Sequence, residues 1–331
     1  MRAGTLPEVF VLKEATSGIQ DVISDWYPLA FKQYSDFLEH ACAFKVVVFA
    51  TFPEHHLDVA NMLADRACPG QHFLLVIHNP SGLESSGARA FLSRVNATIV
   101  ALAPHTVRVA SEALHLMTLP DSVPVRLFIP VFPIKDLSDG CQASGICSSP
   151  QAQRRTFLLQ GLFQSQRRDY SGLFDSVAKS KELTSASNFT LRLIGKGELA
   201  IPASLRGRVI KDTDLAYEEY YKAVGEALAV LPAFSSDAYY TRKASSSVAT
   251  AIICGTPLLG DQQLLDTYTY LTGPAVYVKQ PGKSDADAMA RLLSITADED
   301  AARRDAIKNL REGLYSVNGD VIGELLTNAL Q

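Results

Sequence analysis

The chain lacks the features that mark membrane proteins and nucleic-acid-binding proteins. No segment of its 331 residues approaches the run of about 18 apolar residues that a membrane-spanning helix needs. The segment after residues 1–7 is mixed rather than apolar, so no signal peptide is recognisable. Charged residues make up only 20% of the chain and the net charge is −4, which removes any general attraction to nucleic acid or anionic membranes. A globular protein of the cytoplasm is expected.

Cysteines are few, and none occurs in a CxxC pair. The odd count of five predicts neither a disulfide framework nor a zinc site and fits a reducing compartment. Cys141 and Cys147 share one loop and would pair only if oxidised, although two free surface thiols are the simpler interpretation. No aspartate pair with DxD spacing lies at the end of an expected strand, so no metal and no other cofactor is expected. The cysteines are Cys42, Cys68, Cys141, Cys147 and Cys254.

The length and the apolar content predict two domains. A chain of 331 residues is too long for one typical core, and 47% apolar residues supply material for buried sheets. Residues 136–155 are rich in Ser, Gly and Gln and show almost no apolar periodicity, which is typical of an interdomain loop. We therefore expect an N-terminal domain over residues 1–135, a linker over 136–155, and a ligand-binding domain over 156–331; the family resemblance described below implies that the first is the acceptor side.

Both halves alternate short apolar runs with segments of helical length. This pattern predicts an α/β fold with two Rossmann-like parallel-sheet domains, which bind ligands beyond the carboxyl ends of their strands. The strands expected in the first half are 9–12, 45–50, 73–77 and 97–102, with a helix over 18–40 that carries Trp26 and a proline-punctuated strand over 123–133. Those of the second half are 156–161, 189–194, 226–231 and 256–260, followed by helices over 285–295, 298–315 and 321–329.

Four fragments of the second half carry a resemblance to a known family. They are residues 157–161, 191–197, 217–232 and 254–259, in this order and spacing. With the two α/β halves, they resemble the GT-B glycosyltransferases, and in particular the nucleotide-sugar enzymes with a group-one transferase domain. The resemblance implies a hexosyltransferase whose C-terminal half binds a UDP- or GDP-sugar. It also implies an acceptor in the cleft and retention of the anomeric configuration.

The turn behind the first strand of the second half carries two arginines. Arg167 and Arg168 follow Gly161, where the resemblance places the donor diphosphate. An arginine grips two phosphate oxygens in a way that lysine cannot, and it would offset the charge that grows on the leaving group. The alternative is a solvated pair of arginines in an exposed turn. We expect one of the two to bind the diphosphate.

A helix start rich in serine is the second candidate for the diphosphate site. Lys243 precedes Ser245, Ser246 and Ser247, and the positions after them have the spacing of a buried helical face. Free N–H groups of a first helical turn attract anions, although an ordinary serine cap explains the same pattern. The resemblance places the donor phosphates and sugar against this helix start.

The sequence departs from the family at two positions of this helix. Many group-one transferases carry two glutamates there, and the matching positions hold Arg242 and Thr250. Arginine accepts no hydrogen bond from a sugar hydroxyl, and threonine offers the ribose only a neutral one. Either the donor is held differently, or donor binding has decayed.

Several weaker candidates follow other strands. Lys196 lies between Gly195 and Gly197, a spacing that lets backbone approach a ligand, although a plain tight turn explains it equally well. Asp261 follows the last expected strand and would bond a sugar hydroxyl or cap a helix. The tyrosines of 217–221 have the spacing of a core face. The donor sugar or nucleoside is thus assigned to Gly161, Gly195, Gly197, Thr250 and Asp261.

On the acceptor side, histidines fall in loops just after strands. His78 follows the most strand-like run of the first half and is the preferred general base if the enzyme inverts configuration. His55, His56 and His105 are the others. Two alternatives to a transferase remain open: a GT-B-like scaffold or regulatory protein that has lost turnover, and another sugar-phosphate enzyme such as a nucleotide-sugar epimerase.

Overall fold

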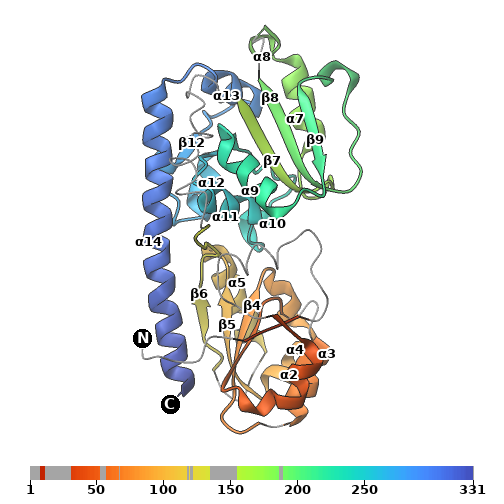
Figure 1. The fold of residues 1–331 in the computed structure, drawn as a ribbon, viewed down its shortest axis with the longest axis vertical. Helices are drawn as coiled ribbons and strands as arrows, with labels where there is room; N and C mark the ends of the chain where they lie inside the picture. Colours follow the sequence, from red (N-terminus) through yellow and green to blue (C-terminus); the bar gives the residue numbers. More distant parts are fainter. Residues whose placement is uncertain are drawn as a thin grey trace. The chain divides into compact units, whose positions relative to one another are not determined.

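The computed structural model describes residues 8–11, 31–52, 57–66, 68–117, 119, 122–134, 155–185 and 189–330 (Figure 1). Contacts divide the chain into two compact units. Unit 1 comprises Met1–Pro130, Thr241–Ala244 and Ser316–Gln331, and unit 2 comprises Val131–Tyr240 and Ser245–Tyr315. Both are α/β with parallel sheets, as the alternation in the sequence predicts. No helix in the described ranges is both long and apolar enough to cross a membrane.

Unit 1 is built on a parallel sheet of four strands in the order β3-β4-β5-β6. Helices connect the strands, because a parallel pair needs a crossover between its members. The strands are β3 (Val46–Phe49), β4 (His72–Ile77), β5 (Asn96–Ala101) and β6 (Val125–Leu127). The helices are α3 (Leu57–Arg66), α4 (Ser86–Leu92) and α5 (Pro104–Leu116), with a 3-10 turn η2 (Pro80–Glu84).

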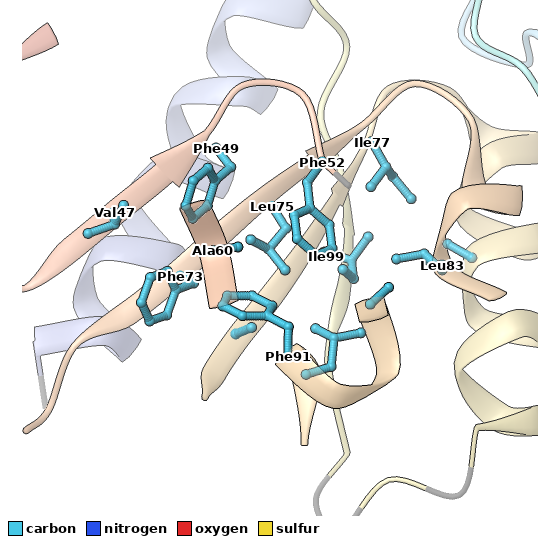
Figure 2. Close-up of a cluster of buried hydrophobic side chains, with 14 of the residues drawn as sticks. Val47, Phe49, Phe52, Ala60, Phe73, Leu75, Ile77, Leu83, Phe91 and Ile99 are labelled. Carbon is cyan, nitrogen blue, oxygen red and sulfur yellow. The ribbon is translucent and has the colours of Figure 1, made fainter. Parts of the chain in front are cut away.

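Aromatic side chains fill one face of this sheet, as Figure 2 shows. The rings of Phe73 and Phe91 meet edge to face with centroids 5.4 Å apart, and Phe49 and Phe52 pack beside them. On the other face, Leu74 and Val100 are buried against Leu325 of the terminal helix. The sheet is therefore covered on both sides, which explains why its strands read as continuous apolar runs.

Unit 2 is built on a parallel sheet of six strands in the order β12-β11-β10-β7-β8-β9. The strand order reverses between β7 and β10, so this is a doubly wound sheet with a switch point at the carboxyl ends of these two strands. The strands are β7 (Thr156–Leu162), β8 (Thr190–Lys196), β9 (Val209–Thr213), β10 (Ala229–Val230), β11 (Leu258–Gly260) and β12 (Val276–Val278).

Short helices connect the strands of unit 2. They are α7 (Tyr170–Lys179), α8 (Lys181–Ser185), α9 (Tyr217–Glu226), α10 (Ala238–Thr241), α11 (Ser246–Ile253), α12 (Gln262–Thr267) and α13 (Asp285–Leu292), with 3-10 turns η4 (Ala203–Leu205) and η5 (Gly273–Ala275). On α9, Tyr221 and Val224 are buried, which confirms the expected core face. The expected strands 156–161, 189–194 and 256–260 are confirmed, and β9 and β12 were missed.

The chain ends in one continuous helix, α14 (Ala297–Leu330), and the prediction of two helices over 298–315 and 321–329 was wrong. Asn318 and Gly319 lie between the two expected helices, and both have low helix propensity. The amide of Asn318 is buried, donates to the carbonyl of Ile129 at 2.7 Å and accepts from its N–H at 3.2 Å. Tertiary hydrogen bonds therefore retain an asparagine that local propensity disfavours.

The start of unit 1 also differs from expectation. The strand over 9–12 is confirmed as β1 (Val9–Val11), but it pairs in parallel with β2 (Phe31–Gln33) in a small separate sheet. A helix over 18–40 was wrong for residues 31–33, because β1 offers them a pairing partner. Only α2 (Tyr34–His40), followed by a 3-10 turn η1 (Ala41–Ala43), is helical in the described part. Trp26 and residues 18–30 lie outside the described residues.

Two cysteines form a disulfide, which corrects the expectation of free thiols. Cys42 in η1 is bonded to Cys68, which lies just before β4. The neighbouring strands β3 and β4 bring these segments together, and Gln71 Nε2 reinforces them by donating to the carbonyls of Ala41 and Phe44, both at 2.9 Å. Cys254 is free. The pairing depends on strand order, which the cysteine spacing does not reveal. Cys141, Cys147, His55 and His56 lie outside the described residues.

Candidate functional site

Arg168 is fixed at the switch point of the sheet of unit 2. The chain leaving β7 turns back at Gln164, whose carbonyl accepts from the N–H of Arg168 at 3.2 Å. Arg168 then forms an isolated antiparallel bridge with Phe234, in the segment that follows β10. These constraints bury the arginine where the strand order reverses, and only 3% of it is exposed.

Within the described part of the chain, the guanidinium of Arg168 has hydrogen-bond partners but takes part in no ion pair. Its Nη2 donates to Ser247 Oγ at 2.7 Å, and its Nη1 donates to the carbonyl of Arg167 at 3.0 Å. Its Nε is buried without a partner, and none of the ion pairs among the described residues includes it. Burial lowers the pKa of this guanidinium below its usual value. A buried cation without a counter-charge is costly, and such groups are typical of anion sites.

Glycines at the ends of β7 and β8 allow close backbone packing beside Arg168. Gly161 has φ +130°, and a Cβ added there would lie 3.6 Å from Arg168 Nη2. A Cβ on Gly195 would lie 1.8 Å from the carbonyl oxygen of Gly161, which no side chain tolerates. Gly197 also adopts a positive φ, at +107°. Glycine is therefore required at Gly195, because the backbone of β7 already occupies the place of a side chain there.

The start of α11 supplies the second part of the site. Ser245 is the residue before the helix, and its side chain makes no capping hydrogen bond. Its Oγ is buried without a partner, whereas Ser247 Oγ is buried and accepts from Arg168. Ser246 is exposed. Helix N–H groups, an unpartnered hydroxyl and a buried guanidinium thus converge, a combination suited to phosphate oxygens.

Lys243 and His78 lie together in unit 1. The backbone carbonyl of Lys243 is 2.9 Å from Nε2 of His105, and the N–H of Ala244 donates to the carbonyl of His78 at 3.2 Å. The His78 ring is exposed, with Nε2 3.4 Å from the carbonyl of Ala50. The loop after β4 and the first turn of α5 are therefore joined to residues 241–244, and His105 lies in that helix rather than in the loop expected from the sequence.

The remaining candidates are engaged elsewhere. Arg167 is exposed, and exposed Lys196 lies with Nζ 3.4 Å from a carboxylate oxygen of Asp214. Thr250 Oγ1 accepts from the hydroxyl of Tyr220 at 3.3 Å. Asp261 caps α12 by accepting from the N–H of Leu264 at 2.9 Å, the alternative that the sequence had left open. The structure thus brings together Gly161, Arg168, Gly195, Ser245 and Ser247.

Three residues near the switch point were not predicted to contact Arg168 or the ligand, although the Tyr239-Tyr240 pair was noted in the sequence as support for the neighbouring helix start. Phe234 and Tyr239 place their ring centroids 5.3 and 5.2 Å from the Arg168 guanidinium. Gln160, one residue before Gly161, is 6% exposed and its Nε2 has no partner. A signal existed only for Gln160, as a polar side chain inside an apolar strand. Phe234 stands in a loop and Tyr239 in the short helix α10, and local sequence gives no indication of what either ring packs against.

Two pockets formed by described residues lie elsewhere in the chain. A pocket of about 360 Å³ beside α8 and α13 is lined by Lys283, Asp287 and Arg291, and another of about 470 Å³ in unit 1 is lined by Ser111 and His115. Neither involves Arg168 or its neighbours. Across the described ranges, no group of three or more His, Cys, Asp or Glu side chains is arranged to hold a metal ion. The candidate site is distinguished by its unbalanced charge.

Comparison with known proteins places the fold. No family model matches the sequence. No curated protein matches it. Among solved structures, Anabaena Alr3699/HepE in complex with UDP and glucose matches with a TM-score of 0.62 at 11% identity, over 96% of this chain and 91% of that one.

Two further solved structures agree with this placement. A trehalose-phosphate synthase (UDP-forming) from Burkholderia vietnamiensis matches with a TM-score of 0.59 at 10% identity, over 90% of this chain and 77% of that one. The sucrose-phosphate synthase of Thermosynechococcus elongatus matches with a TM-score of 0.54 at 14% sequence identity, over 92% of this chain and 82% of that one. The chain has the fold of the GT-B glycosyltransferases, as its resemblance to that family implied.

Proposed function

We propose that the chain is a glycosyltransferase that binds the diphosphate of a nucleotide-sugar at the switch point of its second sheet. Arg168, the first turn of α11 and Ser245 would contact the phosphate oxygens. The observation that carries this proposal is the buried guanidinium of Arg168, which donates to Ser247 and has no carboxylate partner in the ion pairs described. An anionic ligand would supply the missing counter-charge. The UDP complex of the HepE protein, which shares the fold, supports this choice of ligand.

The chemistry requires the site to stabilise a leaving nucleoside diphosphate. Negative charge grows on the oxygen between the sugar and the diphosphate as the bond from this oxygen to the sugar breaks. Fixed hydrogen-bond donors lower the barrier if they are positioned to stabilise that charge. Hydrogen bonds to Ser247 and to the carbonyl of Arg167 already hold the guanidinium of Arg168 in place, so it needs little reorientation when the charge appears. The proposal needs no metal, because the guanidinium and the helix N–H groups supply the positive charge.

The other candidates keep subordinate roles in the proposal. Ser246 and Lys196 would add charge or donors around the diphosphate, whereas the exposed Arg167 would stay in solvent, and Gly161, Gly195 and Gly197 would let the nucleotide approach the backbone. Thr250 would have to release Tyr220 before it could bond a ribose, and Asp261 would use the carboxylate oxygen that does not cap α12. His78 would act on the acceptor only in an inverting reaction.

A second candidate function is nucleotide-sugar binding without turnover. One observation favours it: the two positions where many group-one transferases carry glutamates hold Arg242 and Thr250, and Thr250 is already hydrogen-bonded to Tyr220. A protein of this kind would serve as a scaffold or regulator. It would bind the diphosphate through Arg168 but would leave the bond to the sugar intact.

The test measures the thermal unfolding of the full chain with millimolar UDP, GDP or ADP. A ligand that binds only the native state adds about 2.7 kcal/mol of stability at a concentration 100 times its Kd. At least one nucleotide should raise the melting temperature of the wild type. Arg168→Met should abolish the rise, whereas the matched control Arg167→Met should retain it. A melting temperature that no nucleotide changes would contradict the proposal.

Hydrolysis of the donor separates the two functions. If a nucleotide stabilises the chain, the corresponding nucleotide-glucose is incubated with the wild type and with Arg168→Met, and release of the nucleoside diphosphate is followed. Release by the wild type that Arg168→Met abolishes supports a transferase. Binding without any release over an extended incubation supports the second candidate.

A further inference from the structure

Two aromatic rings cover the guanidinium of Arg168. The rings of Phe234 and Tyr239 stack with centroids 4.7 Å apart and planes 18° apart. The guanidinium carbon lies 5.3 Å from one centroid and 5.2 Å from the other, so the cation is within interaction distance of both rings. With only 3% of Arg168 exposed, a diphosphate reaches little of the guanidinium while the rings stay in this position.

The backbone that carries the two rings is held in place, which leaves the side chains as the movable part. Ala233 adopts φ +41°, in the left-handed region, and its carbonyl accepts from the N–H of Asp169 at 3.0 Å. The carbonyl of Tyr239 accepts from the hydroxyl of Tyr268 at 2.9 Å. Uncovering Arg168 would therefore require the buried Tyr239 side chain to move while this backbone stays in place.

We infer that Phe234 and Tyr239 are positioning residues of the proposed diphosphate site. Their stacked rings orient the guanidinium of Arg168 and keep it covered, and they turn aside when the diphosphate enters. Attraction between a cation and an aromatic face compensates part of the cost of burying an unpaired charge, and it strengthens when water is excluded. The inference rests on the proposed function, because it names how that same site is held and opened.

The first experiment tests the cover without using any nucleotide. Phenylglyoxal modifies accessible arginines, and peptide mass spectrometry compares Arg168 with its exposed neighbour Arg167 in the same molecule. Because a covered group reacts only through local opening, Arg168 should react about tenfold more slowly than Arg167 in the wild type. Tyr239→Ala should bring the two rates within about threefold of each other. Equal rates in the wild type would show that the rings do not cover Arg168.

The second experiment tests positioning by calorimetric titration with UDP. Loss of the cation–ring contact in Tyr239→Ala should weaken binding about three- to thirtyfold. Tyr239→Phe keeps the ring and should restore the wild-type affinity. The control is Tyr217→Ala, which removes a half-buried ring packed against Tyr220 and Tyr221 on α9. Circular dichroism checks folding, and Phe234→Leu replaces Tyr239→Ala if that variant does not fold.

The outcomes separate the inference from the proposed function. If Tyr239→Ala binds UDP as tightly as the wild type while Arg168→Met does not bind, the positioning role is overturned and the proposed function stands. If the wild type binds none of UDP, GDP and ADP, the proposed function is overturned and the positioning role with it. The labelling rates then still decide whether the rings cover Arg168.

Discussion

At the scale of single residues, Arg168 should destabilise the ligand-free protein while providing a binding group for the proposed diphosphate. Removing a guanidinium from water is expensive, and Ser247 and a backbone carbonyl return only part of that cost. Replacement of a buried charge by an apolar side chain of similar size is often neutral or stabilising. The guanidinium that we propose for diphosphate binding thus lowers the stability of the ligand-free protein. Perturbed buried charges of this kind are common at functional sites.

Arg168→Met should therefore unfold at the same or a higher urea concentration than the wild type when no ligand is present. We expect a gain of about 0–3 kcal/mol, because methionine fills the space without an unpaired charge. Arg167→Met, at an exposed position, should change stability by less than about 0.5 kcal/mol. A loss of several kcal/mol in Arg168→Met alone would show that the guanidinium serves the fold rather than a ligand.

Tyr170 gives a second prediction at this scale, in alkaline solution. Burial raises the pKa of Tyr170 to about 12, and its hydroxyl donates to the carbonyl of Leu162 at 3.3 Å. A tyrosine in the unfolded chain ionises near pH 10, so the unfolded state loses its proton first. The contribution of Tyr170 is therefore complete below about pH 10 and is lost as the pH rises toward 12, by up to about 2.7 kcal/mol.

The measurement compares wild type and Tyr170→Phe by urea unfolding between pH 8 and 11. Other buried tyrosines, including Tyr221 and Tyr277, also have raised pKa values, so the wild type should lose stability steeply over this range. The variant has one ionising group fewer and should lose less. Parallel profiles for the two proteins would contradict the assignment to Tyr170.

At the scale of elements, strands with apolar side chains on both faces could be predicted from sequence. Runs such as 73–77 and 156–161 are buried on both sides, so their composition alone identifies them. The missed strand β9 lies at an edge of its sheet, has Ile210 48% exposed, and carries Lys211 and Asp212. An edge strand needs no apolar alternation to be held, because its partner β8 supplies the hydrogen bonds.

The candidate site was predictable only in its parts. Gly161 and Ser247 follow local rules for strand ends and helix starts, so the sequence indicates each of them. The contact between Arg168 and Ser247 joins positions 79 residues apart, and no local pattern reports such a pair. The choice of Arg168 over Arg167 depends on which side chain the turn directs inward. That direction follows from the bridge to Phe234, which exists only in the folded chain.

The terminal helix offers a prediction from two adjacent residues. Asn318→Ala removes both hydrogen bonds to the backbone of Ile129 and leaves the N–H and carbonyl of Ile129 without these partners. This should lower the free energy of unfolding by about 1–3 kcal/mol, even though alanine has the better helix propensity. Gly319→Ala meets nothing within 4 Å and should stabilise the helix by about 0.5–1 kcal/mol. Urea unfolding measures both. A stabilising Asn318→Ala would mean that propensity outweighs the buried contacts.

At the scale of the whole molecule, stability is divided between two units with separate cores. Their buried clusters are made of different residues, with Phe73 and Phe91 in one and Phe157 and Leu193 in the other. A perturbation confined to one core should therefore reduce protection in that unit first. The disulfide between Cys42 and Cys68 belongs entirely to unit 1 and provides such a perturbation.

Cys42→Ser combined with Cys68→Ser should destabilise unit 1 by roughly 3 kcal/mol, because the bond closes a loop with a sequence separation of 26 residues in the unfolded chain. Hydrogen exchange followed by mass spectrometry should show faster exchange in β3 and β4 and unchanged exchange in β7 and β8. Peptide mapping of the unreduced wild type should first recover Cys42 joined to Cys68. Equal acceleration in both sheets would show that the two cores unfold as one. Unchanged exchange throughout would show that Gln71, which bonds Ala41 and Phe44, holds this corner without the disulfide.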